Sequence, residues 1–282
     1  MSAQAAKALA LQSPIALTLR RAGARMYARH AAPIPMRARE RKIDMLLFFL
    51  RHGDPIYDPD SLTPLGERQA EALARRLARY GLDRIYASSS TRAQLTARPT
   101  CELLKLDMEI LDWCNEAHAW AELAMEDDSG RRRWAFQNPE WRRIMLSRDV
   151  RALGERWHEH PAFAGTKLGS GMARIERETH AFLRSLGFDY DAESNSYKVV
   201  GASPDRIALF AHQGFGLAFL SCVLGIPYPE FSTHFDMGHS GMTVIEFADE
   251  GGYAVPTVLQ LANDSHIYAG GLPTDYQNRL RF

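Results

Sequence analysis

The sequence has no excess of charge of either sign, because 34 Lys and Arg residues balance 34 Asp and Glu residues. Proteins that bind nucleic acid or an anionic membrane through their overall field carry a marked positive excess. We therefore expect no nucleic-acid partner and no membrane partner, and any recognition of an anion must be local. Long hydrophobic runs are also lacking. The longest, Met45 to Leu50, is far too short to cross a bilayer and predicts a buried strand.

Cysteine is scarce, with 3 residues at Cys101, Cys114 and Cys222. Their odd number, wide separation and lack of paired metal-ligand spacing argue against a disulfide framework and against a cysteine-based metal site. The pattern is typical of reduced thiols in a reducing compartment. We therefore expect a cytoplasmic protein.

Acidic residues are lacking from residues 1–39, which carry seven Lys and Arg residues. An Arg-rich, acid-poor start is typical of a mitochondrial transit peptide, and the protein would then be mitochondrial. The alternative, which we favour, is that translation begins at Met36 or Met45. Both explanations divide the chain in the same way, into a basic extension at residues 1–42 and a folded domain at 43–282.

Strands and helices alternate after the first strand. Thr63 and Pro64 are typical of a helix start, and apolar residues at helical spacing extend that helix to about Tyr80. Between 117 and 169 the alternation stops, and we predict a helical insertion there. The other predicted elements are strands at 84–87, 108–111 and 207–211, helices at 91–104, 174–186 and 215–224, and a final hairpin of 242–247 and 253–261. This order predicts an α/β fold, a three-layer α/β/α sandwich with a mostly parallel central sheet.

Three short motifs follow predicted strands, at the positions where open α/β sheets bind ligands. Arg51-His52-Gly53 combines a guanidinium suited to phosphate, a nucleophilic imidazole and a glycine that permits close backbone approach. Arg92 stands in the first turn of a helix, where the N-terminus favours an anion. His212-Gln213-Gly214 again joins a strand to a helix. Together the motifs predict one crevice that binds phosphate.

This ordered set of motifs resembles the histidine phosphatase superfamily, which also contains the cofactor-dependent phosphoglycerate mutases. The resemblance covers residues 45–125 and 170–247 and implies a phosphoglycerate mutase-like fold. The segments that carry it are Leu50-Arg51-His52-Gly53, Leu62-Thr63-Pro64-Leu65-Gly66, Arg92-Ala93-Gln94-Leu95-Thr96-Ala97, Asn115-Glu116, and His212 with Gly214.

The resemblance also implies a role for each matching residue. His52 would attack phosphorus and become phosphohistidine, which water then hydrolyses. Arg51, Arg92 and a cationic His212 would hold the phosphoryl oxygens. Glu116 would protonate the leaving oxygen and later activate water, which suits a carboxyl of raised pKa. Because this chemistry depends on positioning and neutralisation of charge, we expect neither a metal ion nor any other cofactor.

Several assignments stay open at this stage. His118 and Glu122 stand close to Glu116 in the sequence and are alternative acids. His239 would either line the pocket or serve a turn. We expect the tryptophans of the insertion to belong to the core rather than to a substrate platform. Arg131 to Arg133 would form a solvated face or bind a second anionic group of the substrate.

The sequence departs from the family at two positions near the motifs. Many members have Ser or Thr and then Asn shortly after the nucleophile, polar groups that help to bind phosphate, whereas Asp54 to Tyr57 follow here. Gln213 stands where glycine is commoner, which predicts a narrower pocket or an added hydrogen-bonding group.

The predicted function is hydrolysis of a phosphomonoester, with a small phosphorylated molecule as the substrate. Three alternatives stay open. The first is a mutase that returns the phosphoryl group from His52 to the substrate, the second a protein phosphatase, and the third a non-catalytic phosphate-binding module. We expect specificity to depend on the insertion at 117–169, and a homodimer is compatible with the sequence.

Overall fold

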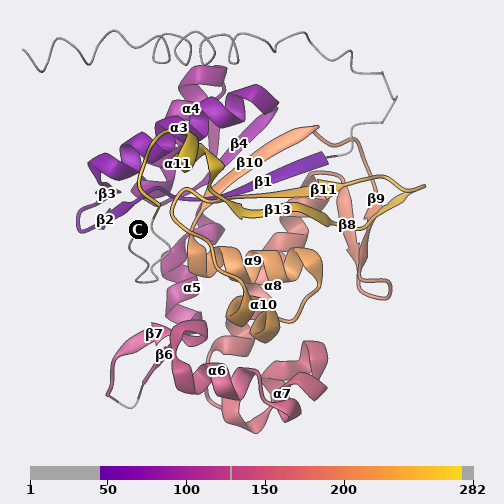
Figure 1. Cartoon of the computed structure of the whole chain (residues 1–282). Coiled ribbons are helices and arrows are strands. Elements are labelled where there is room, and N and C mark those ends of the chain that lie inside the picture. The colour runs from indigo at the N-terminus through magenta and orange to yellow at the C-terminus, as the bar shows by residue number, and fades with distance from the viewer. Residues whose placement is uncertain (1–44, 128, 275–282) are drawn as a thin grey trace, which may run out of the picture. The chain divides into compact units, whose positions relative to one another are not determined.

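The computed structural model describes residues 45–127 and 129–274 (Figure 1). The predicted basic extension lies outside the described residues, so both explanations for it stay predictions. Within the described residues, every helix is too short or too polar to pass through a membrane.

A six-stranded sheet forms the centre of the fold, in the order β13-β11-β1-β10-β4-β5. Neighbours among β1, β10, β4 and β5 pair in parallel, whereas β11 pairs antiparallel with both β1 and β13. The prediction of a mostly parallel central sheet is therefore confirmed. The strands of this sheet are β1 Met45–Arg51, β4 Arg84–Ser88, β5 Met108–Leu111, β10 Arg206–Ala211, β11 Met242–Phe247 and β13 Thr257–Asn263.

Helices cover both faces of the sheet, which gives the predicted three layers (Figure 1). The helices α3, α4 and α11 lie on one face, and α5, α8, α9 and α10 lie on the other. Both predicted starts, at Pro64 and Thr91, are correct. The bounds are α3 Pro64–Tyr80, α4 Thr91–Leu104, α5 Glu116–Leu123, α8 Leu168–Ser185, α9 Gln213–Leu224, α10 Tyr228–His234 and α11 Ser265–Ala269.

The first strand shows why both faces need a helical cover. Successive side chains of a strand point to opposite faces. Phe48 and Leu50 enter the core beneath α3 and α4, whereas Leu47 and Phe49 enter the core beneath α8 and α9. All four are fully buried, and each contributes roughly 1.5–3 kcal/mol relative to exposure in water.

The insertion is mainly helical, as predicted, but it also contains a short hairpin. After α5, the strands β6 (Ala124–Glu126) and β7 (Arg132–Trp134) pair antiparallel. The helices α6 and α7 lie beyond α9 and α10, on the side away from the sheet (Figure 1). The remaining elements are η2 Ala135–Gln137, α6 Pro139–Met145, α7 Arg148–Ala152, η3 Gly154–Glu159 and η4 Pro161–Phe163.

The second half of the chain differs from the prediction in two places. The stretch after α8, for which no strand is predicted, contains a hairpin of β8 (Phe188–Asp191) and β9 (Ser196–Val199). The strand predicted at 253–261 is divided, because β12 (Tyr253–Ala254) pairs with β9 whereas β13 pairs with β11. Pro256 stands at the division, where it cannot donate to a ladder.

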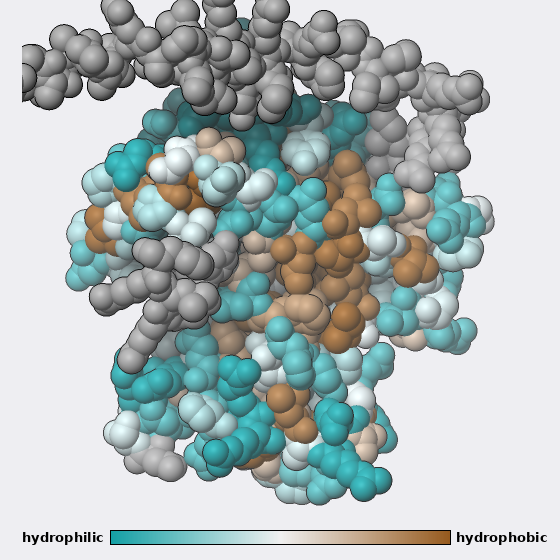
Figure 2. Space-filling model, viewed as in Figure 1, coloured by the Kyte–Doolittle hydropathy of each residue, from teal (hydrophilic) through white to brown (hydrophobic). Residues whose placement is uncertain are grey.

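Apolar side chains gather near the sheet edge that β13 forms (Figure 2). Val255, Leu259 and Leu261 are exposed there. An exposed edge strand can pair with another chain. The homodimer stays a prediction.

Candidate active site

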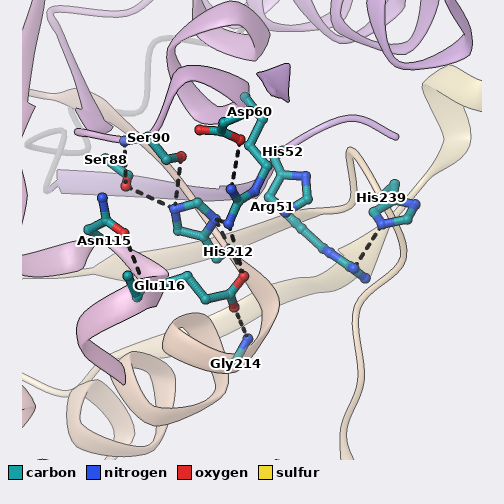
Figure 3. Close-up of polar contacts among 12 residues, drawn as sticks. Arg51, His52, Asp60, Ser88, Ser90, Asn115, Glu116, His212, Gly214 and His239 are labelled. Carbon is teal, nitrogen blue, oxygen red and sulfur yellow. Dashed lines mark hydrogen bonds and ion pairs between the residues drawn. The ribbon is translucent and has the colours of Figure 1, made fainter. Parts of the chain in front are cut away.

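The carboxyl ends of neighbouring parallel strands bring the predicted site residues together (Figure 3). Arg51 ends β1 and His52 follows it, while Arg92 stands in the first turn of the helix after β4. His212 follows β10 and is the N-cap of α9. Glu116 begins α5, the first helix of the insertion. All five residues predicted from the sequence therefore lie in one cluster.

His52 is fully buried and held in one orientation. Its Nδ1 lies 2.7 Å from the carbonyl oxygen of Gly53, so Nδ1 carries the proton and donates. The Nε2 atom then presents a lone pair, and it has no hydrogen-bond partner among the described residues. Burial, together with the nearby His212 and Arg51, holds the pKa of His52 well below its ordinary value. The ring is therefore a neutral nucleophile at neutral pH.

Two glycines allow the loop after His52 to pass close to the start of α3. A Cβ on Gly53 would lie 2.7 Å from the carbonyl oxygen of Gly66, and a Cβ on Gly66 would overlap the carbonyl oxygen of Asp54. Thr63 closes the same junction, because its hydroxyl caps α3 at the N–H of Gly66. This packing fixes the loop against the helix.

The guanidinium of Arg92 lies between two carboxylates. Nη1 donates to Oδ1 of Asp60 at 2.8 Å, and Nη2 lies 3.4 Å from Oε2 of Glu116. Nη2 also donates to Nδ1 of His212 at 3.2 Å. The ring of Tyr57 lies beneath the guanidinium, 5.3 Å from its carbon. These contacts hold a fixed cation at the N-terminus of α4, where an anion is already favoured.

His212 is neutral in these surroundings, which differs from the cationic ring that we expected. Its Nδ1 accepts from Arg92, so Nε2 carries the proton and lies 2.8 Å from Oγ of Ser88 and 3.3 Å from Oγ of Ser90. Burial, then Arg92 and Arg51, hold the pKa of His212 well below its ordinary value. A phosphate dianion between the guanidinium groups would oppose this effect and favour protonation.

Glu116 is the carboxyl that faces the two histidines. Oε1 accepts from the N–H of Gly214 at 2.8 Å, and Oε2 lies 3.6 Å from Nδ1 of His212. Asn115 caps α5 and so fixes the backbone beside Glu116. Burial raises the pKa of Glu116, although the N–H of Gly214 and the charge of Arg92 oppose the rise. A carboxyl with a raised pKa can serve as a proton donor near neutral pH.

The two alternative acids lie elsewhere. Nε2 of His118 lies 3.0 Å from Oδ2 of Asp112 on the exposed surface. Glu122 forms an ion pair of 2.7 Å with Arg174. Neither side chain lines the cavity that opens at Arg51 and Arg92, whereas Glu116 does.

Arg51 is buried and is held by groups from far along the chain. Nη1 donates to the carbonyl oxygen of Met237 at 2.6 Å, and Nη2 donates to Nε2 of His239 at 2.8 Å. Nδ1 of His239 lies 3.3 Å from Oδ1 of Asp54, which places the proton on Nδ1. Burial lowers the pKa of Arg51, but a guanidinium stays charged at neutral pH. His239 therefore holds the guanidinium of Arg51, and it does not line the cavity that opens at Arg51 and Arg92.

A cavity of ≈ 770 Å³ opens at this cluster. Trp120 and Trp134 of the insertion line it. Trp134 and Trp157 are buried in the core, and Trp120 and Trp141 pack against it, so the expectation of core tryptophans is confirmed, although two of the four also line the cavity. A Cβ on Gly214 would overlap the indole of Trp134. The insertion thus reaches the N-terminus of α9 and forms one wall of the site.

Among the described residues, one group has the geometry to hold a metal ion. Ring nitrogens of His52 and His212 and a carboxylate oxygen of Glu116 lie within 4.8 Å of one another. The guanidinium groups of Arg51 and Arg92 border the same atoms and would repel a cation. The distribution of charge therefore favours an anion at this position.

Comparison with known proteins confirms the resemblance seen in the motifs. Residues 47–258 match the family model of the histidine phosphatase superfamily (branch 1). The phosphoserine phosphatase from Entamoeba histolytica, solved in complex with 3-phosphoglyceric acid, has a TM-score of 0.52 and 15% identity, over 79% of this chain and 99% of its own.

Two solved mycobacterial proteins, called hydrolase 1 and hydrolase 2, are also similar. Both have a TM-score of 0.50, with 18% and 20% identity. The matches cover 78% and 80% of this chain and 99% and 97% of those chains, respectively. Likeness at this identity shows the fold. No curated protein sequence is significantly similar to the chain.

Proposed function

The chain belongs to the histidine phosphatase superfamily, and on this premise we propose that it hydrolyses a phosphomonoester through a phosphohistidine on His52. The observation that carries the proposal is the lone pair of Nε2 of His52. That atom is buried, has no hydrogen-bond partner among the described residues and lies close to Arg51 and Arg92. A neutral nucleophile beside two fixed cations is suited to attack on a phosphoryl group.

In the first step, Nε2 of His52 forms a bond to phosphorus, and the bond from phosphorus to the leaving oxygen breaks. The protonated form of Glu116, which burial favours by raising the pKa of this carboxyl, gives its proton to that oxygen, and an alcohol or phenol departs. Arg51 and Arg92 face the negative charge that is spread over the three phosphoryl oxygens.

In the second step, the carboxylate of Glu116 takes a proton from water, and the water oxygen attacks phosphorus. The bond from Nε2 of His52 to phosphorus breaks, and its electron pair returns to the ring. Inorganic phosphate leaves, and Glu116 is protonated again. One water molecule is consumed, and we propose that neither step uses a metal ion or another cofactor.

The test is hydrolysis of p-nitrophenyl phosphate and of small sugar and glycerate phosphates, with EDTA present throughout. We expect wild-type protein and the surface control His118→Ala to be active, and His52→Ala to be inactive although its thermal unfolding is unchanged. Full activity of His52→Ala would exclude the phosphohistidine route. Loss of wild-type activity in EDTA would indicate a metal enzyme.

The same assay separates the alternatives. Transfer from a bisphosphate donor to an isomer that exceeds hydrolysis would favour the mutase. Release of phosphate from a phosphorylated protein but from none of the small esters would favour the protein phosphatase. Binding of inorganic phosphate with neither hydrolysis nor transfer would leave the phosphate-binding module.

A further inference from the structure

Arg51 and Arg92 form what we call the phosphate end of the cavity, and the wall beyond them consists of aromatic rings and amides. The insertion supplies Trp120, Trp134 and Gln137, while Tyr57 and Gln213 come from β2 (Pro55–Tyr57) and from the start of α9. The rings of Trp120 and Trp134 meet edge to face, with centroids 4.9 Å apart. All five side chains are uncharged, so this wall offers apolar contact and hydrogen bonds but no ionic partner.

Only two cationic side chains line the cavity within the part of the chain that the structure describes, and both belong to the phosphate end. They are Arg51 and Arg92, and the carboxyl groups of Asp60 and Glu116 line the same cavity. Arg92 already pairs with both carboxylates, at 2.8 and 3.4 Å. The cations therefore suffice for one phosphoryl group, and a second anion would face Asp60 with no cation opposite.

The arginines of the insertion do not supply the missing cation. The guanidinium of Arg132 lies over the ring of Trp120, 5.9 Å from its centroid, but Nη2 already donates to the carbonyl oxygens of Trp120 and Ala121, at 3.1 Å each. Nε of Arg133 lies 3.1 Å from Asp127. Neither of these side chains, nor that of Arg131, lines the cavity. The hypothesis that one of them binds a second anionic group is therefore not supported.

We infer that the substrate is a phosphomonoester whose leaving group is uncharged and has an aromatic or apolar face. This inference rests on the proposed function and specifies its substrate class. The phosphoryl group lies at Arg51 and Arg92, and the leaving group lies against Trp120, Trp134 and Tyr57. Phosphorylated hydroxy acids are poor substrates, because their carboxylate meets a wall that lacks a cation and includes Asp60.

The test compares two esters that differ by one charge, phenyl phosphate and 4-carboxyphenyl phosphate. We expect kcat/KM to be about tenfold higher for phenyl phosphate, since an uncompensated unit charge at short range is costly in a protein cleft. The carboxylate makes the phenol a slightly better leaving group, so intrinsic reactivity acts in the opposite direction. The difference should shrink at high ionic strength.

A charge placed in the wall gives the second arm of the test. Gln137 is exposed and lines the cavity. Gln137→Arg should raise the ratio of kcat/KM for 4-carboxyphenyl phosphate to kcat/KM for phenyl phosphate by about fivefold or more. Gln137→Met, of similar size but uncharged, is the control and should leave the ratio of the two esters as in the wild type.

The outcomes separate the inference from the proposed function. If both esters are hydrolysed at equal rates, or the carboxylate ester faster, the inference is wrong and the phosphatase activity stands. A Gln137→Arg variant with the same ratio of kcat/KM for the two esters as the wild type would also contradict the inference. If folded wild-type protein hydrolyses neither aryl ester but does hydrolyse a glycerate phosphate, the inference is wrong and the proposed function stands. If it hydrolyses no phosphate ester of the panel, the proposed function fails and the inference falls with it.

Discussion

Nε2 of His239 accepts a hydrogen bond of 2.8 Å from Nη2 of Arg51, across 188 positions of the sequence. Asp54 lies 3.3 Å from the other ring nitrogen and so orients the imidazole. Asp54 belongs to the loop where many members of the family have polar groups that help to bind phosphate. In this chain Asp54 orients His239, and His239 in turn holds the guanidinium of Arg51. Asp54 and His239 are therefore positioning residues.

Replacement of His239 by Ala should raise the inhibition constant for inorganic phosphate by about tenfold. The reason is that Arg51 loses one of the groups that hold it, and a hydrogen bond to a charged group is worth about 1.5–3 kcal/mol at most. His239→Gln, whose side-chain oxygen can still accept from Arg51, should recover part of the loss. His234→Ala, an exposed histidine on α10, is the control. An inhibition constant unchanged in His239→Ala would contradict the positioning role.

Replacement of Arg92 by Ala should weaken the binding of inorganic phosphate by about 1.5–3 kcal/mol, the scale of a charged hydrogen bond. Calorimetric titration measures this directly. Arg92→Lys keeps the charge but loses the planar fork, so we expect an intermediate affinity. If Arg92→Ala binds inorganic phosphate as tightly as the wild type does, Arg92 does not take part in binding phosphate. Arg75→Ala, a change on the exposed face of α3, is the matched control.

The pH profile of kcat/KM should show the raised pKa of Glu116. Its protonated form is needed in the first step, so the rate falls as pH rises through that pKa. The acidic limb comes from His52 and lies well below 6.5, because the histidine must stay neutral. Glu116→Gln should lose the alkaline limb and should slow an alkyl phosphate more than p-nitrophenyl phosphate. Both proteins share the titration of the substrate, so it cancels in the comparison. If the alkaline limb is unchanged in Glu116→Gln, the titrating group responsible for that limb is not Glu116.

Acid should destabilise the fold through His266. Burial, and then the charge of Arg76, lower the pKa of His266 from 6.5 to about 4, and its Nε2 lies 2.8 Å from Oγ of Ser240. Because the unfolded chain binds this proton more tightly, the stabilisation is complete above pH 6.5 and is lost as pH falls toward 4. The difference amounts to about 3 kcal/mol.

Urea unfolding at a series of pH values measures this effect. His266→Gln should flatten the change in the free energy of unfolding between pH 6.5 and 4 relative to the wild type. Since His52 and His212 also have lowered pKa values, some acid sensitivity stays in the variant. Identical slopes for the two proteins in this interval would contradict the assignment to His266.

The sequence predicts the central fold well where local signals are strong. The cap at Thr63 and the run of apolar residues after it give α3 its correct bounds, and the buried run at β1 is long enough to be recognised. The hairpins β6–β7 and β8–β9 escape prediction because strands of three or four residues are too short to show a period.

Some residues of the candidate site can be predicted from the sequence, and others cannot. Arg51, His52, Arg92 and His212 can be predicted to meet, because each follows a strand of one sheet. The role of His239 cannot be predicted, since its partner Arg51 is distant in the sequence and a turn explains it equally well. The positions of Trp120 and Trp134 depend on how the insertion packs, which residue spacing does not reveal.

The two ends of the cavity are encoded in separate stretches of the chain. The nucleophile His52, His212 and the two arginines stand at the ends of β1, β4 and β10, and Glu116 begins α5, whereas residues 120–137 supply most of the wall. Substitutions in this one segment can therefore alter which ester is accepted while the nucleophile and its cations stay in place. Substrate range can diverge among descendants of such a chain without a new catalytic apparatus, and the same segment is the place to begin a redesign.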